Sequence, residues 1–299
     1  MPPLYLHSMA NFDPVIEGAL DIVSGRRLVE VGAEGAIFSS FLAEYAQRHG
    51  GDVRCVDPAP STALADLAAR EDGVTLLLDY SPAALAELQD ADVYVLDGDH
   101  NWHIVNGELR ALRDRLLDPV KPALVILHDV QWPCARRDMY YAPELIPEGE
   151  RQPYTYDSGI SPGNAGLDPH GFRGAGVFAV AEHEGGPRNG VLTAVEDFVE
   201  ATPGLVHRIV PVVFGCGFLY ASAAPWAAEL DAYLAPYDRS PLLERMEANR
   251  LALYLHVLAI QDELDRRAGI QAQVVSGLRR RIAELEAGAA AVQDGAVAP

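Results

Sequence analysis

The chain has 299 residues and a formal net charge of −20, with 49% hydrophobic and 22% charged residues. This is the composition of a globular protein that is long enough to bury one or two cores. The excess of acid disfavours a nucleic-acid partner, whose phosphates it would repel.

No apolar run approaches the length of a membrane span, and the first residues lack a basic region followed by an apolar segment. Three widely spaced cysteines, Cys55, Cys134 and Cys216, match neither a zinc pattern nor a disulfide framework. We therefore expect a cytoplasmic protein that acts on a small molecule and has neither a membrane nor a nucleic acid as its partner.

Apolar stretches alternate with helical patterns over the first 130 residues. Helices are expected over residues 10–24, around 39–45 and over 104–117, and strands over 27–31, 53–57, 74–78, 93–96 and 123–127. This alternation predicts a doubly wound α/β sheet, in which ligands bind beyond the carboxyl ends of the strands.

The turn after the first strand contains two glycines, Gly32 and Gly35, flanked by Glu30 and Glu34. A dinucleotide fingerprint needs three glycines so that the pyrophosphate can approach the helix. Carboxylates at this turn would repel a pyrophosphate but can hold a cationic ligand, such as the sulfonium and ammonium groups of S-adenosylmethionine. The alternative is an ordinary turn between strand and helix.

Each of the next four strands ends in an acid, namely Asp57, Asp79, Asp97 and Asp129. Asp57 stands where such an acid accepts hydrogen bonds from ribose hydroxyls. Four acids at four consecutive strand ends indicate one ligand site at the shared edge of the sheet.

The fourth strand runs into Asp97-Gly98-Asp99-His100, and the fifth into His128-Asp129. Carboxylates and imidazoles at this density can bind a metal, accept a proton, or do both. The alternative is a turn that caps the next helix, with His100 in a structural role.

With these motifs, the sequence resembles the class I S-adenosylmethionine-dependent methyltransferases over about residues 10–130, with a return at 190–221. The resemblance implies a seven-stranded Rossmann-like sheet with an antiparallel terminal strand, which a helix at 193–199 and a hairpin at 206–220 would complete. It implies S-adenosylmethionine as the cofactor, held by Glu30, Gly32, Glu34, Ser39, Asp57, Asp79, Tyr80, Ser81 and Asp97.

The acid-histidine segment is similar to that of the metal-dependent small-molecule O-methyltransferases, notably those that methylate sugars of macrolide antibiotics. The resemblance implies Mg²⁺ or another divalent ion bound by Asp97 and Asp129, with His100 as the general base. His128 stands where that group usually has an acid or an amide, and it is a third candidate ligand. Transfer to nitrogen or carbon stays open, because the same fold serves all three.

Residues 130–190 form a long insertion that is rich in proline, glycine and aromatic residues. A structureless loop of this length in a compact domain is usually functional. We expect a lid that binds a glycosylated or phenolic natural product, through Trp102 from the preceding helix and through Trp132, Arg136, Tyr140 and Tyr141. The alternatives are an ordered surface excursion and a dimer contact.

Residues 1–222 are thus expected to form the methyltransferase domain. Residues 223–287 carry an interrupted heptad pattern that predicts a helical appendage joining a homo-oligomer, and residues 288–299 are expected to be disordered. Two other functions are consistent with the residues: an NAD-dependent oxidoreductase, and a non-catalytic scaffold that acts through the C-terminal helices.

Overall fold

The computed structural model describes residues 5–33 and 35–295 of the chain. The chain divides into two compact units, Met1–Leu251 and Ala252–Pro299, which are treated separately below. Among the described residues, no helix combines the length and the apolar character needed to cross a bilayer.

A seven-stranded sheet forms the centre of the first unit, in the order β3-β2-β1-β4-β5-β10-β9. The pairs from β3 to β5 are parallel, whereas β10 runs antiparallel to both of its neighbours. The expected Rossmann-like sheet with an antiparallel terminal strand is therefore confirmed. Its strands are β1 (Arg27–Val31), β2 (Asp52–Val56), β3 (Val74–Leu77), β4 (Val93–Leu96), β5 (Leu124–Leu127), β9 (Leu205–Val210) and β10 (Cys216–Ala221).

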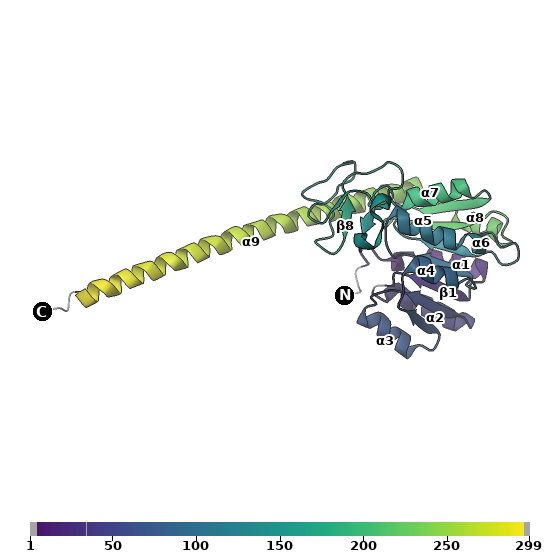
Figure 1. The fold of residues 1–299 in the computed structure, drawn as a ribbon, viewed down its shortest axis with the longest axis horizontal. Coiled ribbons are helices and arrows are strands. Elements are labelled where there is room, and N and C mark those ends of the chain that lie inside the picture. The colour runs from purple at the N-terminus through teal and green to yellow at the C-terminus, as the bar shows by residue number, and fades with distance from the viewer. Residues whose placement is uncertain (1–4, 34, 296–299) are drawn as a thin grey trace. The chain divides into compact units, whose positions relative to one another are not determined.

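Helices pack on both faces of this sheet (Figure 1). On one face α4, α5 and α7 are neighbours, and on the other α1 contacts both α2 and α8. All residues of β4 and β5 are buried, as expected for central parallel strands covered on both sides. The helical elements of the sheet domain are η1 (Met9–Phe12), α1 (Asp13–Val23), α2 (Ile37–His49), α3 (Thr62–Arg70), α4 (Ser81–Glu87), α5 (Trp102–Ala111), α6 (Arg113–Leu116), α7 (Val191–Ala201) and α8 (Ala227–Leu234).

The insertion is an ordered substructure rather than a structureless loop. It contains a small antiparallel sheet, β6-β8-β7, and two short 3₁₀ helices. The guanidinium of Arg137 is buried within it and donates hydrogen bonds to the carbonyls of Asn164, Ala165, Gly166 and Ala181. The elements are β6 (Met139–Tyr140), η2 (Pro143–Leu145), η3 (Glu148–Glu150), β7 (Tyr154–Thr155) and β8 (Ala179–Ala181).

The last helix, α9 (Pro241–Gly295), begins in the first unit and makes up the described part of the second. A helical appendage was expected to begin at residue 223. In the structure α8 is part of the first unit, because Ala227, Leu230 and Leu234 lie in its core. α9 continues to Gly295, into the segment 288–299 for which we expect disorder. Residues 296–299 lie outside the described residues.

Candidate active site

The carboxyl ends of the central strands open onto a cavity of about 780 Å³. Glu30 from β1 and the acids that follow β2, β3, β4 and β5 all line this cavity. Neighbouring parallel strands end at the same edge of the sheet, and between β1 and β4 the strand order reverses, which is where such sheets bind ligands. The acids predicted to share one site therefore lie around one cavity.

Gly32 brings the first turn against the end of β4. Its φ is +81°, and a Cβ at this position would lie 2.1 Å from the backbone oxygen of Asp97. Only glycine fits such a left-handed conformation at such close approach. Gly35 also lines the cavity, but a Cβ there would meet no atom within 4 Å. Glu34, a predicted cofactor ligand, lies outside the described residues.

Glu30 is buried beneath this turn, with 3% of its surface exposed. Burial raises the pKa of its carboxyl to about 7, although the Cys55 thiol, which donates to Glu30 Oε2 at 3.5 Å, acts in the opposite direction. Ser39 was predicted to bind the cofactor, but it does not line the cavity. Its hydroxyl is buried without a hydrogen-bond partner among the described residues.

Asp57 and Asp79 are oriented by hydrogen bonds within their own turns. Asp57 Oδ1 accepts the N–H of Ala59 at 2.8 Å, and Asp79 Oδ1 accepts the N–H of Tyr80 at the same distance. In each case the second carboxylate oxygen is not used by that bond. Both side chains can therefore accept hydrogen bonds from the hydroxyls of a nucleoside.

Ser81 and Tyr80 line the same part of the cavity. The Ser81 hydroxyl donates to Glu108, a fully buried acid on α5 that the sequence did not single out. Burial raises the pKa of Glu108 to about 8, so this acid is protonated at neutral pH. The pair joins α4 to α5 beside the cavity.

His128 stands between the two strand-end carboxylates. Its Nδ1 lies 3.0 Å from Asp97 Oδ1 and 3.3 Å from Asp129 Oδ2, and its Nε2 donates to the carbonyl of Val213 at 2.9 Å. Burial alone lowers the pKa of His128, but the two carboxylates outweigh burial and raise it to about 10. Protonated His128 therefore neutralises part of this acidic cluster.

A divalent ion fits the same cluster. One donor atom each from Asp97, His100 and Asp129 lies within 4.8 Å of the others, with His100 Nδ1 at 3.4 Å from Asp129 Oδ2. His128 Nε2 donates to a backbone carbonyl, as in many metal-bound histidines, but its Nδ1 lies 3.0 Å from Asp97 Oδ1 and could bind an ion only after losing its proton. Two carboxylates with imidazole suit a divalent transition metal and accommodate Mg²⁺.

The turn that carries His100 is not a capping turn formed by Asp97 or Asp99. The N-cap of α5 is Asn101, whose side chain accepts the N–H of Ile104 at 3.0 Å. Asp99 instead accepts the N–H groups of His100 and Tyr141 at 3.1 and 3.3 Å. Asp99 therefore ties the turn to the insertion.

Of the five predicted substrate-binding residues, only Tyr141 lines the cavity. Arg136 forms an ion pair with Glu196 on α7, Trp102 donates to Asp197, and Trp132 makes edge-to-face contacts with Phe172 and Phe214. Tyr140 is fully buried and donates to Asp138. Aromatic and basic composition did not separate the residues that make contacts within the insertion from those that face the cavity.

The cavity also has an apolar wall, most of which the sequence analysis missed. Its residues come from α5, the insertion and the loop before β10: Ile104, Met139, Leu145, Ile146, Phe172, Phe178 and Phe214. Phe172 packs against both other phenylalanines at ring-centroid distances of 5.6 and 5.8 Å. The hydrophobic pattern within one strand or helix could not predict this wall, because its residues come from segments that are far apart in the chain.

The first turns of α9 hold the loop that supplies Phe214. Val213 and Phe214 both have positive φ, and Glu247 accepts their two N–H groups at 2.9 and 3.1 Å. Arg250 pairs with Glu247 and lies 4.9 Å above the Phe214 ring. The same loop presents the Val213 carbonyl to His128, so Glu247 supports both the acidic and the apolar side of the cavity.

Comparisons with known proteins bear on this site. Residues 29–130 match a protein family described as a methyltransferase domain. No curated protein is significantly similar in sequence.

Among solved structures, a Podospora anserina methyltransferase bound to S-adenosylhomocysteine is 12% identical, with a TM-score of 0.45 over 74% of this chain and 82% of that one. A Bacillus cereus O-methyltransferase complex is 14% identical, with a TM-score of 0.42 over 73% and 84% of the two chains. A putative caffeoyl-CoA O-methyltransferase from Staphylococcus aureus is 12% identical, with a TM-score of 0.42 over 71% and 83%.

Similarity at this level to a solved structure does not identify a substrate, because one fold serves many reactions. The family match runs from within β1 through β5 and therefore includes the first turn and the carboxyl ends of all five strands at the cavity. Residues 29–130 therefore belong to a methyltransferase domain, in agreement with the class I S-adenosylmethionine-dependent family that the sequence resembles.

Proposed function

We propose that the chain transfers the methyl group of S-adenosylmethionine to a hydroxyl of a small aromatic molecule, with a divalent ion at the acidic cluster. One observation carries the proposal: Asp97, His100 and Asp129 converge within 4.8 Å in the cavity that the glycine turn and the apolar wall share. A cofactor on the acidic side and an acceptor on the apolar side would meet at these three residues.

The cofactor side is suited to a cation without phosphate. The cavity is lined by Glu30, Asp57, Asp79 and Asp97, and no arginine or lysine is among its described lining residues. A pyrophosphate would be repelled by these carboxylates and would find no arginine or lysine in the described lining to neutralise it, whereas a sulfonium and an ammonium group would be attracted. This charge supports S-adenosylmethionine over the NAD alternative.

The acceptor side is suited to a flat ring. Tyr141, Phe172, Phe178 and Phe214 offer faces and edges against which an aromatic acceptor can stack. A sugar also stacks on aromatic rings, but its remaining hydroxyls need polar partners that this wall does not provide. We therefore favour a phenolic acceptor over a glycosylated one.

In the proposed reaction, His100 takes the proton of the acceptor hydroxyl. Its Nδ1 faces Asp129 at 3.4 Å, and that carboxylate stabilises the imidazolium as it forms. The acceptor oxygen then attacks the methyl carbon, the carbon–sulfur bond breaks, and S-adenosylhomocysteine leaves. Asp97 and Asp129 would hold the ion, joined by His128 only in its deprotonated form, and the bound ion would lower the pKa of the acceptor hydroxyl. The remaining task of the chain is alignment and the exclusion of water.

Calorimetry with S-adenosylmethionine and with NAD tests the cofactor, and methyl transfer to catechol and to a simple hexoside tests the acceptor. We expect binding of S-adenosylmethionine alone, methylation of catechol, loss of activity after chelation by EDTA, and recovery with Mg²⁺ or Mn²⁺. Binding of NAD, or of neither cofactor, would overturn the proposal as a whole.

Full activity after chelation would overturn only the metal. That result would leave protonated His128 as the cation of the cluster, a role that its raised pKa supports. Methylation of the hexoside but not of catechol would overturn the aromatic acceptor while leaving the cofactor assignment intact.

A further inference from the structure

Beyond Leu251, α9 carries an exposed apolar seam. Ten positions alternate in steps of four and three residues from Leu253 to Leu285, which is the heptad spacing of a left-handed coiled coil. Three of them are polar: Arg267, Gln271 and Arg281. The other seven are apolar and each is 47–60% exposed: Leu253, Val257, Ile260, Leu264, Val274, Leu278 and Leu285.

Three more exposed apolar side chains flank the seam. Ile270, Val275 and Ile282 occupy the heptad positions beside it and are 48%, 39% and 54% exposed. They widen the apolar stripe at and beyond its centre. A stripe of this width and length is the signature of a helix that buries one face against a partner.

We propose that residues 253–285 of α9 pair with the same segment of a second copy of the chain, in an antiparallel two-stranded coiled coil centred on residue 269. The reason is that the seam is complementary to itself in this register. Each seam position faces another seam position, so that none of the ten is left without a counterpart. The segment would be about 50 Å long, at 1.5 Å per residue.

The pairs match in polarity as well as in position. Leu253 faces Leu285 of the second copy, Ile260 faces Leu278, and Leu264 faces Val274, each twice by symmetry. The two central polar residues, Arg267 and Gln271, face each other.

Only Val257 opposite Arg281 is mixed. There the long arginine side chain can cover the valine while its guanidinium reaches water.

Other arrangements of the same helices are less favourable. A parallel pair in register sets Arg267 against Arg267 and Arg281 against Arg281, and it brings the two basic runs 279–281 side by side. Like charges at the seam are destabilising. A shift of the antiparallel register by one heptad in either direction places Leu264 opposite an arginine. The seam thus selects both the orientation and the register.

Sedimentation of the full chain at about 1–50 µM tests the pairing. We expect a dimer, which Ile260→Glu dissociates with at least a 100-fold weaker dimer Kd, because its charge would enter a layer with Leu278. Ala259→Glu, one residue away and outside the seam, is the control and should leave the dimer intact. A monomeric wild-type chain, or a dimer that survives Ile260→Glu, would overturn the proposal.

Cysteine pairing tests the orientation. The three native cysteines are buried, so new surface thiols can be read without them. Leu264→Cys and Val274→Cys chains, mixed and mildly oxidised, should form a covalent dimer, whereas either chain alone should not. A covalent dimer from Leu264→Cys alone would show a parallel pair and would contradict the antiparallel assignment.

Discussion

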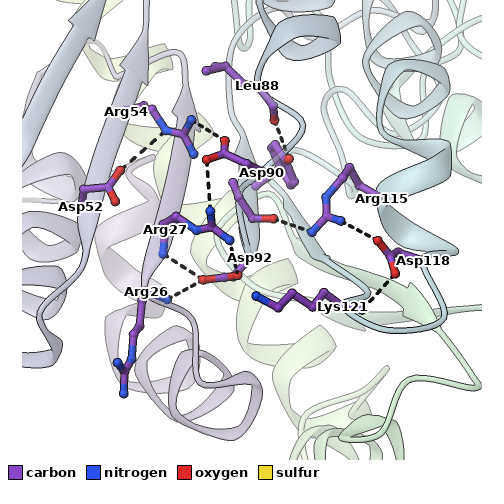
Figure 2. Close-up of polar contacts among 12 residues, drawn as sticks. Arg26, Arg27, Asp52, Arg54, Leu88, Asp90, Asp92, Arg115, Asp118 and Lys121 are labelled. Atoms are coloured by element: carbon purple, nitrogen blue, oxygen red, sulfur yellow. Dashed lines mark hydrogen bonds and ion pairs between the residues drawn. The ribbon is translucent and has the colours of Figure 1, made fainter.

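The two edges of the central sheet carry similar acids in opposite surroundings. At the amino-end edge, Asp90 pairs with Arg27 and Arg54 at 3.2 and 2.6 Å, and Asp92 accepts the N–H groups of Arg26 and Arg27 at 3.0 Å each (Figure 2). At the carboxyl-end edge, Asp57, Asp79, Asp97 and Asp129 face the cavity, where the described lining contains no arginine or lysine.

Hollow volume does not distinguish these two edges. The amino-end edge has a hollow of about 660 Å³ beside Arg26 and Lys121, close to the 780 Å³ of the candidate active site. The two edges differ in whether their acids are paired with arginine. Acids that are neutralised by arginine stabilise the fold, whereas acids that face a cavity with only histidines as cations are available to a ligand.

An Asp→Asn substitution should lower activity at the carboxyl-end edge and stability at the amino-end edge. Asp97→Asn removes a charge from the acidic cluster, and we expect methyl transfer to fall by about 10³-fold or more, since metal assistance is worth several kcal/mol. Asp92→Asn keeps an oxygen that can accept both N–H groups, so turnover should be unchanged and the Tm should fall by about 2–4 °C. Initial rates and thermal melts of both variants measure the contrast. Equal losses of activity would erase the distinction between the edges.

His100 should matter for the rate and not for the cofactor. General-base help is worth about 10²–10⁴-fold, so His100→Ala should slow turnover by that factor with an unchanged Kd for S-adenosylmethionine. His103→Ala, three residues further on in the first turn of α5 and outside the cavity lining, is the control and should keep the wild-type rate. Single-turnover rates and calorimetry separate the two effects, and near-normal turnover of His100→Ala would exclude it as the base.

Gly32 and Gly35 should differ although they share one turn. An alanine at position 32 would overlap the backbone of Asp97 and keep a strained positive φ, at a cost of roughly 2–4 kcal/mol. We expect Gly32→Ala to lower the Tm and to weaken S-adenosylmethionine binding at least tenfold. Gly35→Ala meets no atom within 4 Å and should leave the Tm unchanged. Equal Tm values for the two variants would contradict the close approach.

The smallest expected effect concerns Glu108 and pH. Its folded-state pKa of about 8 lies above the ordinary value of 4.5, so between these values the folded chain binds a proton that the unfolded chain has lost. Stability should therefore fall as the pH rises from 4.5 to 8.

Glu108→Gln should remove this slope, on the order of 1 kcal/mol per pH unit, because the amide can still accept from Ser81. Chemical denaturation of both chains at pH 5, 6.5 and 8 measures it. A constant difference between the two chains would contradict the raised pKa.

Local pattern alone predicted much of this molecule. Apolar runs that end in acids identified the parallel strands, since consecutive β-branched and leucine residues are stable only where both faces of a strand are covered. Gly32, two residues after Glu30, indicated the turn that follows the first strand. A turn with a positive φ favours glycine, and this preference can be read from the sequence alone. Asp57, Asp79, Asp97, His100, His128 and Asp129 could be named in advance because parallel strands deliver their carboxyl ends to one edge.

Only the tertiary structure decided which side chains face the cavity and which hold the insertion together. Trp102, Arg136 and Tyr140 have the chemistry of ligand-binding residues, but their partners Asp197, Glu196 and Asp138 are distant in the chain or buried. The apolar wall and the support from Glu247 likewise join segments separated by tens of residues. Contacts of that kind depend on how the insertion folds back on the sheet. The hydrophobic periodicity of a single helix or strand carries no information about such long-range contacts.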